Sequence, residues 1–160
     1  MKEKEKVCCP EFNPKPWQEK KVTWKGKMFL KGNVIQLFHI PLNFGQVITR
    51  MWNKIESAKA SPKTKDFLML AYDPSPWKSE LYLSITKRIP GEEVALLSGT
   101  FLTKVFDGPY NAVPKWIKEM ESYVKSKGET VERYFFYYTT CPKCAKKYGH
   151  NYVVVFAQLK

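Results

Sequence analysis

The sequence predicts an α+β fold in which an antiparallel sheet carries two helices on one face. Two observations lead to this expectation. Segments with strand-like alternation and segments with apolar residues at helical spacing follow one another along the chain. Their order, strand, helix, strand, strand, occurs twice. We therefore expect duplicated β-α-β-β units, an arrangement that buries the apolar helix stripes against the sheet.

The first half is expected to contain strands at 33–40, 66–72 and 79–87. Between the first two strands, apolar residues recur every three or four positions and predict a helix over 47–58: Val47, Ile48, Met51, Trp52, Ile55 and Ala58. Ser61-Pro62 should end this helix, because the residue before a proline avoids helical geometry. The segment 73–76 contains two prolines and predicts a turn.

The second half is expected to contain strands at 94–106, 132–139 and 151–159. Its helix, over 113–124, is indicated by a second apolar stripe: Val113, Trp116, Ile117, Met120, Tyr123 and Val124. Pro114 suits a first turn, and Gly128 suits the left-handed position after a helix. A loop is expected at 141–150.

The two helices can be overlaid at one offset. This places Ile48 on Val113, Met51 on Trp116 and Ile55 on Met120. The final strands need a larger offset, because the second hairpin loop is longer. We therefore expect an arm at 1–32 packed through its aromatic residues, and a domain at 33–160 with halves of about 33–90 and 91–160.

Composition restricts the classes of protein to consider. Hydrophobic residues make up 44% of the chain, yet no apolar run is long enough to span a membrane. The first residues lack the apolar stretch of a signal peptide, so we expect a cytoplasmic protein. The net charge is +12, but the lysines are dispersed and no nucleic-acid-binding motif is present. We therefore do not expect a nucleic-acid partner, and the sequence does not indicate an oligomeric state.

Cys141 and Cys144 form a C-x2-C pair. This spacing is typical of half a zinc site or of a redox pair, and Cys8, Cys9 or His150 could supply further ligands. A tight turn with two thiols is an equally good interpretation. We expect no cofactor other than zinc at this loop.

The segment 101–110, which ends in Gly108-Pro109-Tyr110, precedes the second helix. This strand, turn and helix, together with the duplication, resembles the GyrI-like small-molecule-binding domains over about 33–159. The resemblance implies a cleft between the two halves that binds bulky aromatic, often cationic, ligands. The segments 38–41 and 141–144 are most similar to a stand-alone branch that hydrolyses cyclopropane-bearing genotoxins of the duocarmycin and yatakemycin type, which is a detoxification reaction.

Alternation along the two final strands selects candidate site residues. Leu81, Leu83 and Ile85 should face the helices, which directs Glu80 and Tyr82 to the opposite side. Overlaying the final strands of the two halves sets Tyr152 opposite Glu80. Many GyrI-like domains have a functional acidic residue on the last strand of the second half, where this chain has Tyr152. We therefore predict Glu80 and Tyr152 as catalytic residues, and the following as ligand-binding residues: Phe38, Trp77, Tyr82, Tyr110, Tyr138 and Phe156.

Two functions fit this site. In the first, Glu80 takes a proton from an attacking water and a tyrosine hydroxyl stabilises the developing phenolate. Burial should then raise the pKa of Glu80 and make it a better base. In the second, the protein binds, sequesters or senses aromatic cations without catalysis. A further alternative is that Glu80 is merely solvated and the tyrosines pack the sheet. His39 has no evident catalytic partner.

Overall fold

A computed structural model describes residues 11–38, 40–63, 66–139 and 142–160. The chain divides into two compact units. The α1 unit consists of residues 23–100 and 135–137, and the α2 unit contains the described parts of 1–22, 101–134 and 138–160. Because strands β1, β5 and β6 cross these boundaries, each contributes residues to both units.

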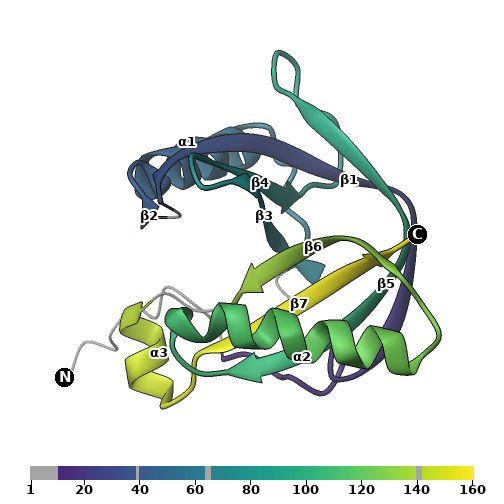
Figure 1. The fold of residues 1–160 in the computed structure, drawn as a ribbon. Helices are drawn as coiled ribbons and strands as arrows, with labels where there is room; N and C mark the ends of the chain where they lie inside the picture. Colours follow the sequence, from purple (N-terminus) through teal and green to yellow (C-terminus); the bar gives the residue numbers. More distant parts are fainter. Residues whose placement is uncertain (1–10, 39, 64–65, 140–141) are drawn as a thin grey trace. The chain divides into compact units, whose positions relative to one another are not determined.

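The elements are labelled in Figure 1. In chain order they are β1 (Lys20–Leu37), β2 (Ile40–Pro41), α1 (Phe44–Ser57), β3 (Met69–Ser75), β4 (Lys78–Ser84), β5 (Val94–Asp107), a short 3-10 helix (Tyr110–Ala112), α2 (Val113–Ser126), β6 (Val131–Tyr138), α3 (Pro142–Tyr148) and β7 (Tyr152–Leu159).

In the α1 unit the strand order is β2-β1-β4-β3-β6, with β1 also paired to β5. The register of β1 against β4 places Gly32 opposite Leu81. A side chain at Gly32 would meet the sulfur of Met51 on α1. Helix α1 therefore packs on the face of the sheet that carries Gly32 and Leu81. Met51 and Ile55 are buried one turn apart, as the apolar spacing predicts.

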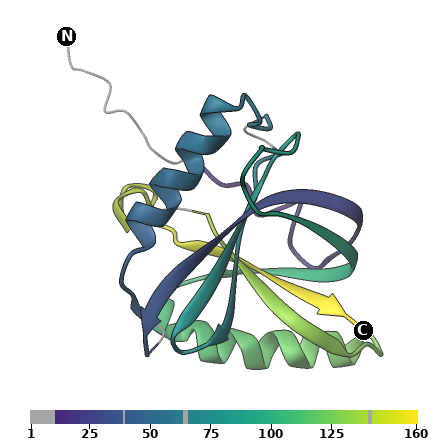
Figure 2. The same cartoon turned by 90° about the horizontal axis from the view of Figure 1, so that it is seen from above.

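In the α2 unit the strand order is β6-β7-β5. Helix α2 runs along this sheet (Figure 2) and buries Trp116, Met120 and Val124 at intervals of four residues. Burying such a side chain contributes about 1.5–3 kcal/mol. The central strand β7 is almost wholly buried between its neighbours. The backbone after α2 turns at Gly128, where φ is 73°, as predicted.

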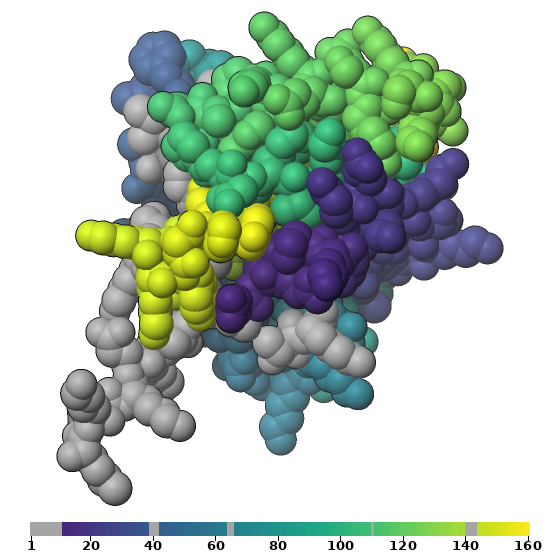
Figure 3. Space-filling view, turned by 90° about the horizontal axis from the view of Figure 1, so that it is seen from below, coloured from purple at the N-terminus to yellow at the C-terminus, as the bar shows by residue number. Residues whose placement is uncertain are grey.

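Residues 11–19 pack on the α2 unit. Figure 3 shows this segment, in purple, against the C-terminal elements in yellow. Trp17 packs edge-on against Phe156, with ring centroids 5.3 Å apart. The Thr103 hydroxyl donates a hydrogen bond to the Trp17 carbonyl at 2.6 Å, and the Val105 N–H donates one to the Gln18 side chain at 2.9 Å. Residues 11–19 thus contact the rest of this unit through an aromatic ring and two hydrogen bonds.

The α+β class is confirmed, and two expected boundaries are wrong. The first strand begins at Lys20 rather than at residue 33, so residues 20–32 form strand and not arm. This stretch is rich in lysine and half-exposed, which conceals its alternation. The expected loop at 141–150 contains α3, a helix without an apolar stripe. The internal duplication stays a prediction, although both units contain a strand, a helix and two strands in that order.

Within the described ranges, no helix combines the length and the apolar character that crossing a bilayer requires.

The contact between Gly32 and α1 yields a stability prediction. Gly32→Ala should lower the free energy of unfolding by about 1–3 kcal/mol, because the added methyl group overpacks the buried Met51. Gly45→Ala is the matched control. Gly45 lies in α1 with open space around it, so alanine should stabilise the protein by about 0.5–1 kcal/mol. Urea unfolding of both variants measures the two effects; a Gly32→Ala protein as stable as the wild type would contradict the close approach.

Candidate functional site

Glu80 lies on β4, on the face of the sheet turned away from α1. Leu81 stands opposite Gly32, which faces α1, and the alternation of a strand therefore directs Glu80 and Tyr82 to the other side. The predicted assignment of these two residues to the face without the helix is thus correct. Tyr72 on β3 stands opposite Glu80 in the ladder.

Among the described residues, the Glu80 carboxylate has three polar partners. The Tyr82 hydroxyl donates a hydrogen bond to Oε2 at 2.7 Å. Nζ of Lys31 lies 3.3 Å from Oε1, and Nζ of Lys78 lies 3.7 Å from the same atom. Only 14% of the Glu80 side chain is exposed, so these contacts are poorly screened by water. Lys31 also contacts Glu93 at 3.4 Å, which makes the cluster electrically balanced.

The prediction that burial raises the pKa of Glu80 is wrong. Burial alone would raise this pKa, but the hydrogen bond from Tyr82 and the charges of Lys31 and Lys78 outweigh it and hold the pKa below its ordinary value. Burial likewise tends to lower the pKa of Lys31, and its contacts with Glu80 and Glu93 raise it overall. Glu80 is therefore an ionised carboxylate at neutral pH and a weaker base than expected.

Aromatic rings surround this face of the α1 unit. Tyr82 is buried and packs edge-on against Phe29 and Phe135. Phe135 also packs against Tyr72, at a centroid distance of 5.7 Å. The Tyr82 ring is therefore fixed, and its hydroxyl is the part that meets the carboxylate. As a ligand contact, Tyr82 would act through this hydroxyl rather than through its ring.

Phe38 and Trp77, both predicted to bind ligand, lie together at the end of the β1–β4 ladder. Their ring centroids are 5.0 Å apart, yet the side chains are 70% and 53% exposed. Phe38 adopts a φ of 50°, which a residue with a side chain rarely does. Four other exposed apolar side chains lie at the end of β1 or between β2 and the first residue of α1: Ile35, Leu37, Leu42 and Phe44. We call these four residues, together with Phe38 and Trp77, the apolar patch of the α1 unit.

The remaining predicted residues belong to the α2 unit. Tyr152 is half-buried at the start of β7, and Tyr138 is half-buried at the end of β6. Phe156 is fully buried, with Trp17 and Phe101 against it, and is a core residue rather than a cleft wall. Tyr110 begins the 3-10 helix, and its side chain is outside the described parts. Because Glu80 and Tyr152 belong to different units, their pairing stays a prediction.

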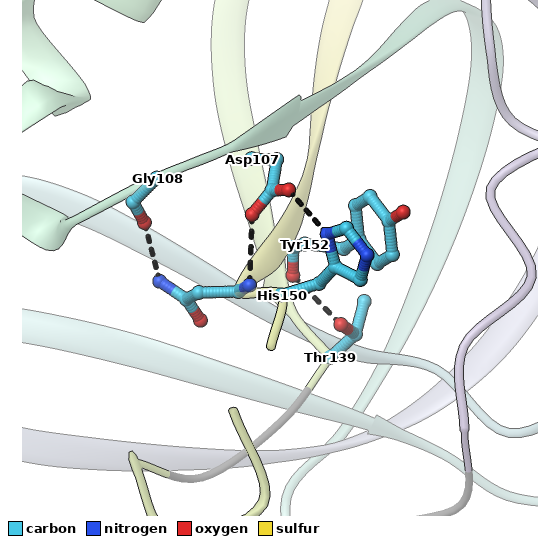
Figure 4. Close-up of polar contacts among 6 residues, drawn as sticks. Asp107, Gly108, Thr139, His150 and Tyr152 are labelled. Carbon is cyan, nitrogen blue, oxygen red and sulfur yellow. Dashed lines mark hydrogen bonds and ion pairs between the residues drawn. The ribbon is translucent and has the colours of Figure 1, made fainter. Parts of the chain in front are cut away.

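A polar network in the α2 unit contains Asp107, which the sequence analysis did not select, and His150, which it considered only as a possible zinc ligand. Oδ2 of Asp107 lies 2.7 Å from Nδ1 of His150, and Oδ1 accepts the backbone N–H of Asn151 at 2.8 Å. The centroids of the His150 and Tyr152 rings are 4.9 Å apart, and the ring planes are 13° from parallel. Figure 4 shows the two rings stacked on each other. In the sequence, Asp107 directly follows the expected strand 94–106 and His150 directly precedes the expected strand 151–159, but no local pattern indicates that these two strand ends meet.

The C-x2-C pair is described only in part. Cys144 is buried within α3, whereas Cys141, Cys8 and Cys9 are outside the described residues. Among the residues that the structure describes, no three histidine, cysteine or acidic side chains cluster as metal ligands would. The zinc site at this loop therefore stays a prediction.

The contacts of Glu80 predict how stability depends on pH. Since its folded pKa is lowered, its contribution is complete above the unfolded pKa of roughly 4.3 and is lost as the pH falls through the folded pKa. Glu80→Gln should therefore destabilise the protein by about 1–3 kcal/mol at pH 7, since it leaves Lys31 and Lys78 with less compensation. The deficit relative to the wild type should shrink on acidification.

Urea unfolding of both proteins from neutral to acidic pH measures this difference. Glu93→Gln is the matched control, because Glu93 contacts the same Lys31 but is 61% exposed, and should cost under about 1 kcal/mol. An equal effect of the two substitutions, or a deficit independent of pH, would count against the pKa shift.

Comparisons with known proteins agree on the fold. The structure is similar to the C-terminal domain of EcmrR (10% identity, TM-score 0.68), covering 90% of this chain and 98% of that one. A hydrolase from Listeria innocua is also similar (6% identity, TM-score 0.64, 90% and 92% covered). SAV2435, solved with tetraphenylphosphonium bound, is more distant (13% identity, TM-score 0.50, 89% and 94% covered). At these low identities the likenesses show a shared fold.

No curated protein sequence matches the chain. The model of one family, described as bacterial hydrolase, matches residues 1–159. Because this match spans nearly the whole chain, the protein belongs to the bacterial hydrolase family.

Proposed function

We propose that this protein binds bulky aromatic small molecules and adds water to electrophilic members of that class, above all to cyclopropane-bearing genotoxins. The observation that carries the proposal is the exposed pair of Phe38 and Trp77 in the apolar patch of the α1 unit. Large apolar rings that stay in water cost free energy, and where they gather they mark a binding surface. The membership of a hydrolase family supports the hydrolytic part.

A flat aromatic ligand suits this patch. Stacking on Trp77 and Phe38 would remove two exposed rings from water and would add the favourable geometry of aromatic pairs, worth about 0.5–1.5 kcal/mol each. A cationic ligand would gain further from the ring faces. The strained backbone at Phe38 fits a side chain held out for contact, because such strain gathers at functional positions. The distant neighbour that binds tetraphenylphosphonium, an aromatic cation, is consistent with this ligand class.

For hydrolysis, Glu80 and Tyr152 are the residues we propose. Water attacks a cyclopropane carbon as a ring C–C bond breaks, and the electron pair moves to the dienone oxygen. Glu80 accepts the proton that water releases, and the resulting phenolate takes up one proton, so that the net change is addition of one water. Tyr152 stabilises the phenolate; among the described residues nothing engages its hydroxyl, which leaves it able to donate.

A second candidate function is binding without catalysis, by a sequestering or sensing module for aromatic cations. The lowered pKa of Glu80 favours it, because a carboxylate held ionised by Lys31 and Tyr82 is a poorer proton acceptor but keeps its negative charge. Both candidates require the same aromatic surface. They differ only in whether the ligand leaves changed.

The binding surface is tested with rhodamine 6G, a fluorescent aromatic cation. Trp77→Ala and Phe38→Ala should each weaken binding about tenfold, or about 1.4 kcal/mol, through the loss of one stacking ring. Binding should persist at high salt, whereas a phosphate-backbone site for a DNA duplex would lose affinity steeply. Trp52→Ala is the matched control, since Trp52 is a partly exposed tryptophan on α1 that packs against Phe67. Equal losses from all three variants would contradict the patch.

The hydrolytic step is tested by mass spectrometry of a cyclopropane-dienone substrate, as the appearance of a product heavier by one water. Glu80→Gln should reduce turnover about 100-fold while leaving rhodamine 6G binding nearly unchanged, because a general base contributes on that order. Tyr152→Phe should reduce it less, through the loss of one hydrogen bond. Full turnover by Glu80→Gln would exclude Glu80 from the mechanism. A wild-type protein that binds the compound but does not change it would favour the sequestering module.

A further inference from the structure

Asp107 and His150 form a carboxylate–imidazole pair in the α2 unit, beside Tyr152. Asp107 is the last residue of β5, and the register of the sheet sets it opposite Tyr152, the first residue of β7. His150 lies between α3 and β7, two residues before Tyr152, and the end of the β5–β7 ladder brings the two side chains together. Asp107 is therefore held by a paired strand, and His150 by the short segment that leads into one.

The hydrogen bonds assign the proton on the imidazole. Oδ1 of Asp107 accepts the N–H of Asn151, which marks the carboxylate as an acceptor. Its other oxygen lies 2.7 Å from Nδ1 of His150, and since a carboxylate can only accept, Nδ1 is the donor. In a neutral imidazole the lone pair is then on Nε2, the nitrogen that can take a proton.

Further contacts hold the ring in place. The His150 ring stacks on Tyr152, and the carbonyl of Tyr152 accepts a hydrogen bond from the Thr139 hydroxyl at 2.7 Å. The Asn151 side chain donates to the carbonyl of Gly108 at 2.6 Å, which ties the two strand ends to each other. Figure 4 shows these contacts gathered around Asp107. Both the plane of the imidazole and the position of the carboxylate are thus determined.

A small hollow adjoins the histidine. It is lined by Glu11, Phe12, Tyr148, His150 and Tyr152, and its volume is about 10 Å³. That is roughly the space that one water molecule needs. Three of the residues that line it are aromatic: Phe12, Tyr148 and Tyr152.

The network is hard to explain by stability alone. The side chains of His150 and Asp107 are 52% and 41% exposed, and an ion pair in such a place contributes at most about 1 kcal/mol. An oriented imidazole that keeps the lone pair of its second nitrogen, on a residue that lines a small hollow, is, in contrast, suited to general-base hydrolysis.

We propose that the Asp107–His150 pair is a second, hydrolytic site, at which His150 activates water toward small aryl esters. His150 is the catalytic base, and Asp107 is a positioning residue that fixes the tautomer. This activity is independent of ligand binding at the apolar patch of the α1 unit. The aryl group is favoured because three of the five residues around the hollow are aromatic.

The step is balanced within these groups. Nε2 of His150 takes a proton from water as the water oxygen forms a bond to the ester carbonyl carbon. The carbonyl electron pair moves to oxygen and returns as the bond to the aryl oxygen breaks. The departing aryl oxide takes the proton from Nε2, which leaves one carboxylic acid, one phenol and the histidine in its starting state.

The test measures hydrolysis of 4-nitrophenyl acetate by the full chain. His150→Gln should lower kcat/KM about 100-fold or more, and Asp107→Asn about 10-fold or more. His39→Gln is the matched control, because it removes the only other histidine of the chain, and it should leave the rate unchanged. Nitrogen-15 NMR of the wild type should show His150 protonated at Nδ1, and Asp107→Asn should lose that preference.

The outcomes separate this site from the proposed function. Equal rates for the wild type and His150→Gln would overturn the proposal, as would a His150 protonated at Nε2 or a wild-type rate no higher than that of buffer. None of these results affects rhodamine 6G binding or the Glu80→Gln assay. Loss of those two activities with a normal ester rate would remove the proposed function and leave the Asp107–His150 site standing.

Discussion

The register of β1 against β4 is the constraint on which the α1 unit depends. With Gly32 opposite Leu81, one face of the sheet meets α1 and the other carries Glu80. A slip of one residue would exchange the faces, turning Glu80 into the helix interface and Leu81 into the polar side. Because Gly32 has no side chain, α1 can approach the sheet closely in the register that turns Gly32 toward the helix. Packing on one face thus fixes the chemistry of the other.

Glu80 shows how a half-buried charge is tolerated and what this costs in reactivity. Removing a carboxylate from water is unfavourable unless hydrogen bonds and opposite charges compensate it. Tyr82, Lys31 and Lys78 supply that compensation. The same partners lower the affinity of Glu80 for a proton, so the features that let the residue sit there also limit it as a base. A ligand that displaced Lys31 would reverse part of this effect.

The sequence was most informative where one residue type repeats with a clear period. The buried positions of α2 follow directly from the spacing of Trp116 and Met120, and the face of Glu80 follows from alternation along β4. The beginning of β1 was missed because lysines on an extended, half-exposed strand resemble an arm. Helix α3 was missed because it has no apolar stripe. Asp107 and His150 are 43 residues apart, and only the pairing of β5 with β7 brings them together. The lowered pKa of Glu80 could not be predicted, because it depends on Lys31, and no local pattern in the sequence shows that Lys31 lies beside Glu80.

The contacts of residues 11–19 have a consequence for the polar groups of β5. A strand that presents unpaired N–H groups is a template on which another chain can add. The Gln18 side chain accepts a hydrogen bond from the N–H of Val105, and the carbonyl of Trp17 accepts one from the hydroxyl of Thr103. Residues 11–19 therefore satisfy polar groups of β5 without forming a strand there. A backbone N–H that pairs with no partner strand is thereby satisfied within the chain, by a segment that itself presents no strand edge.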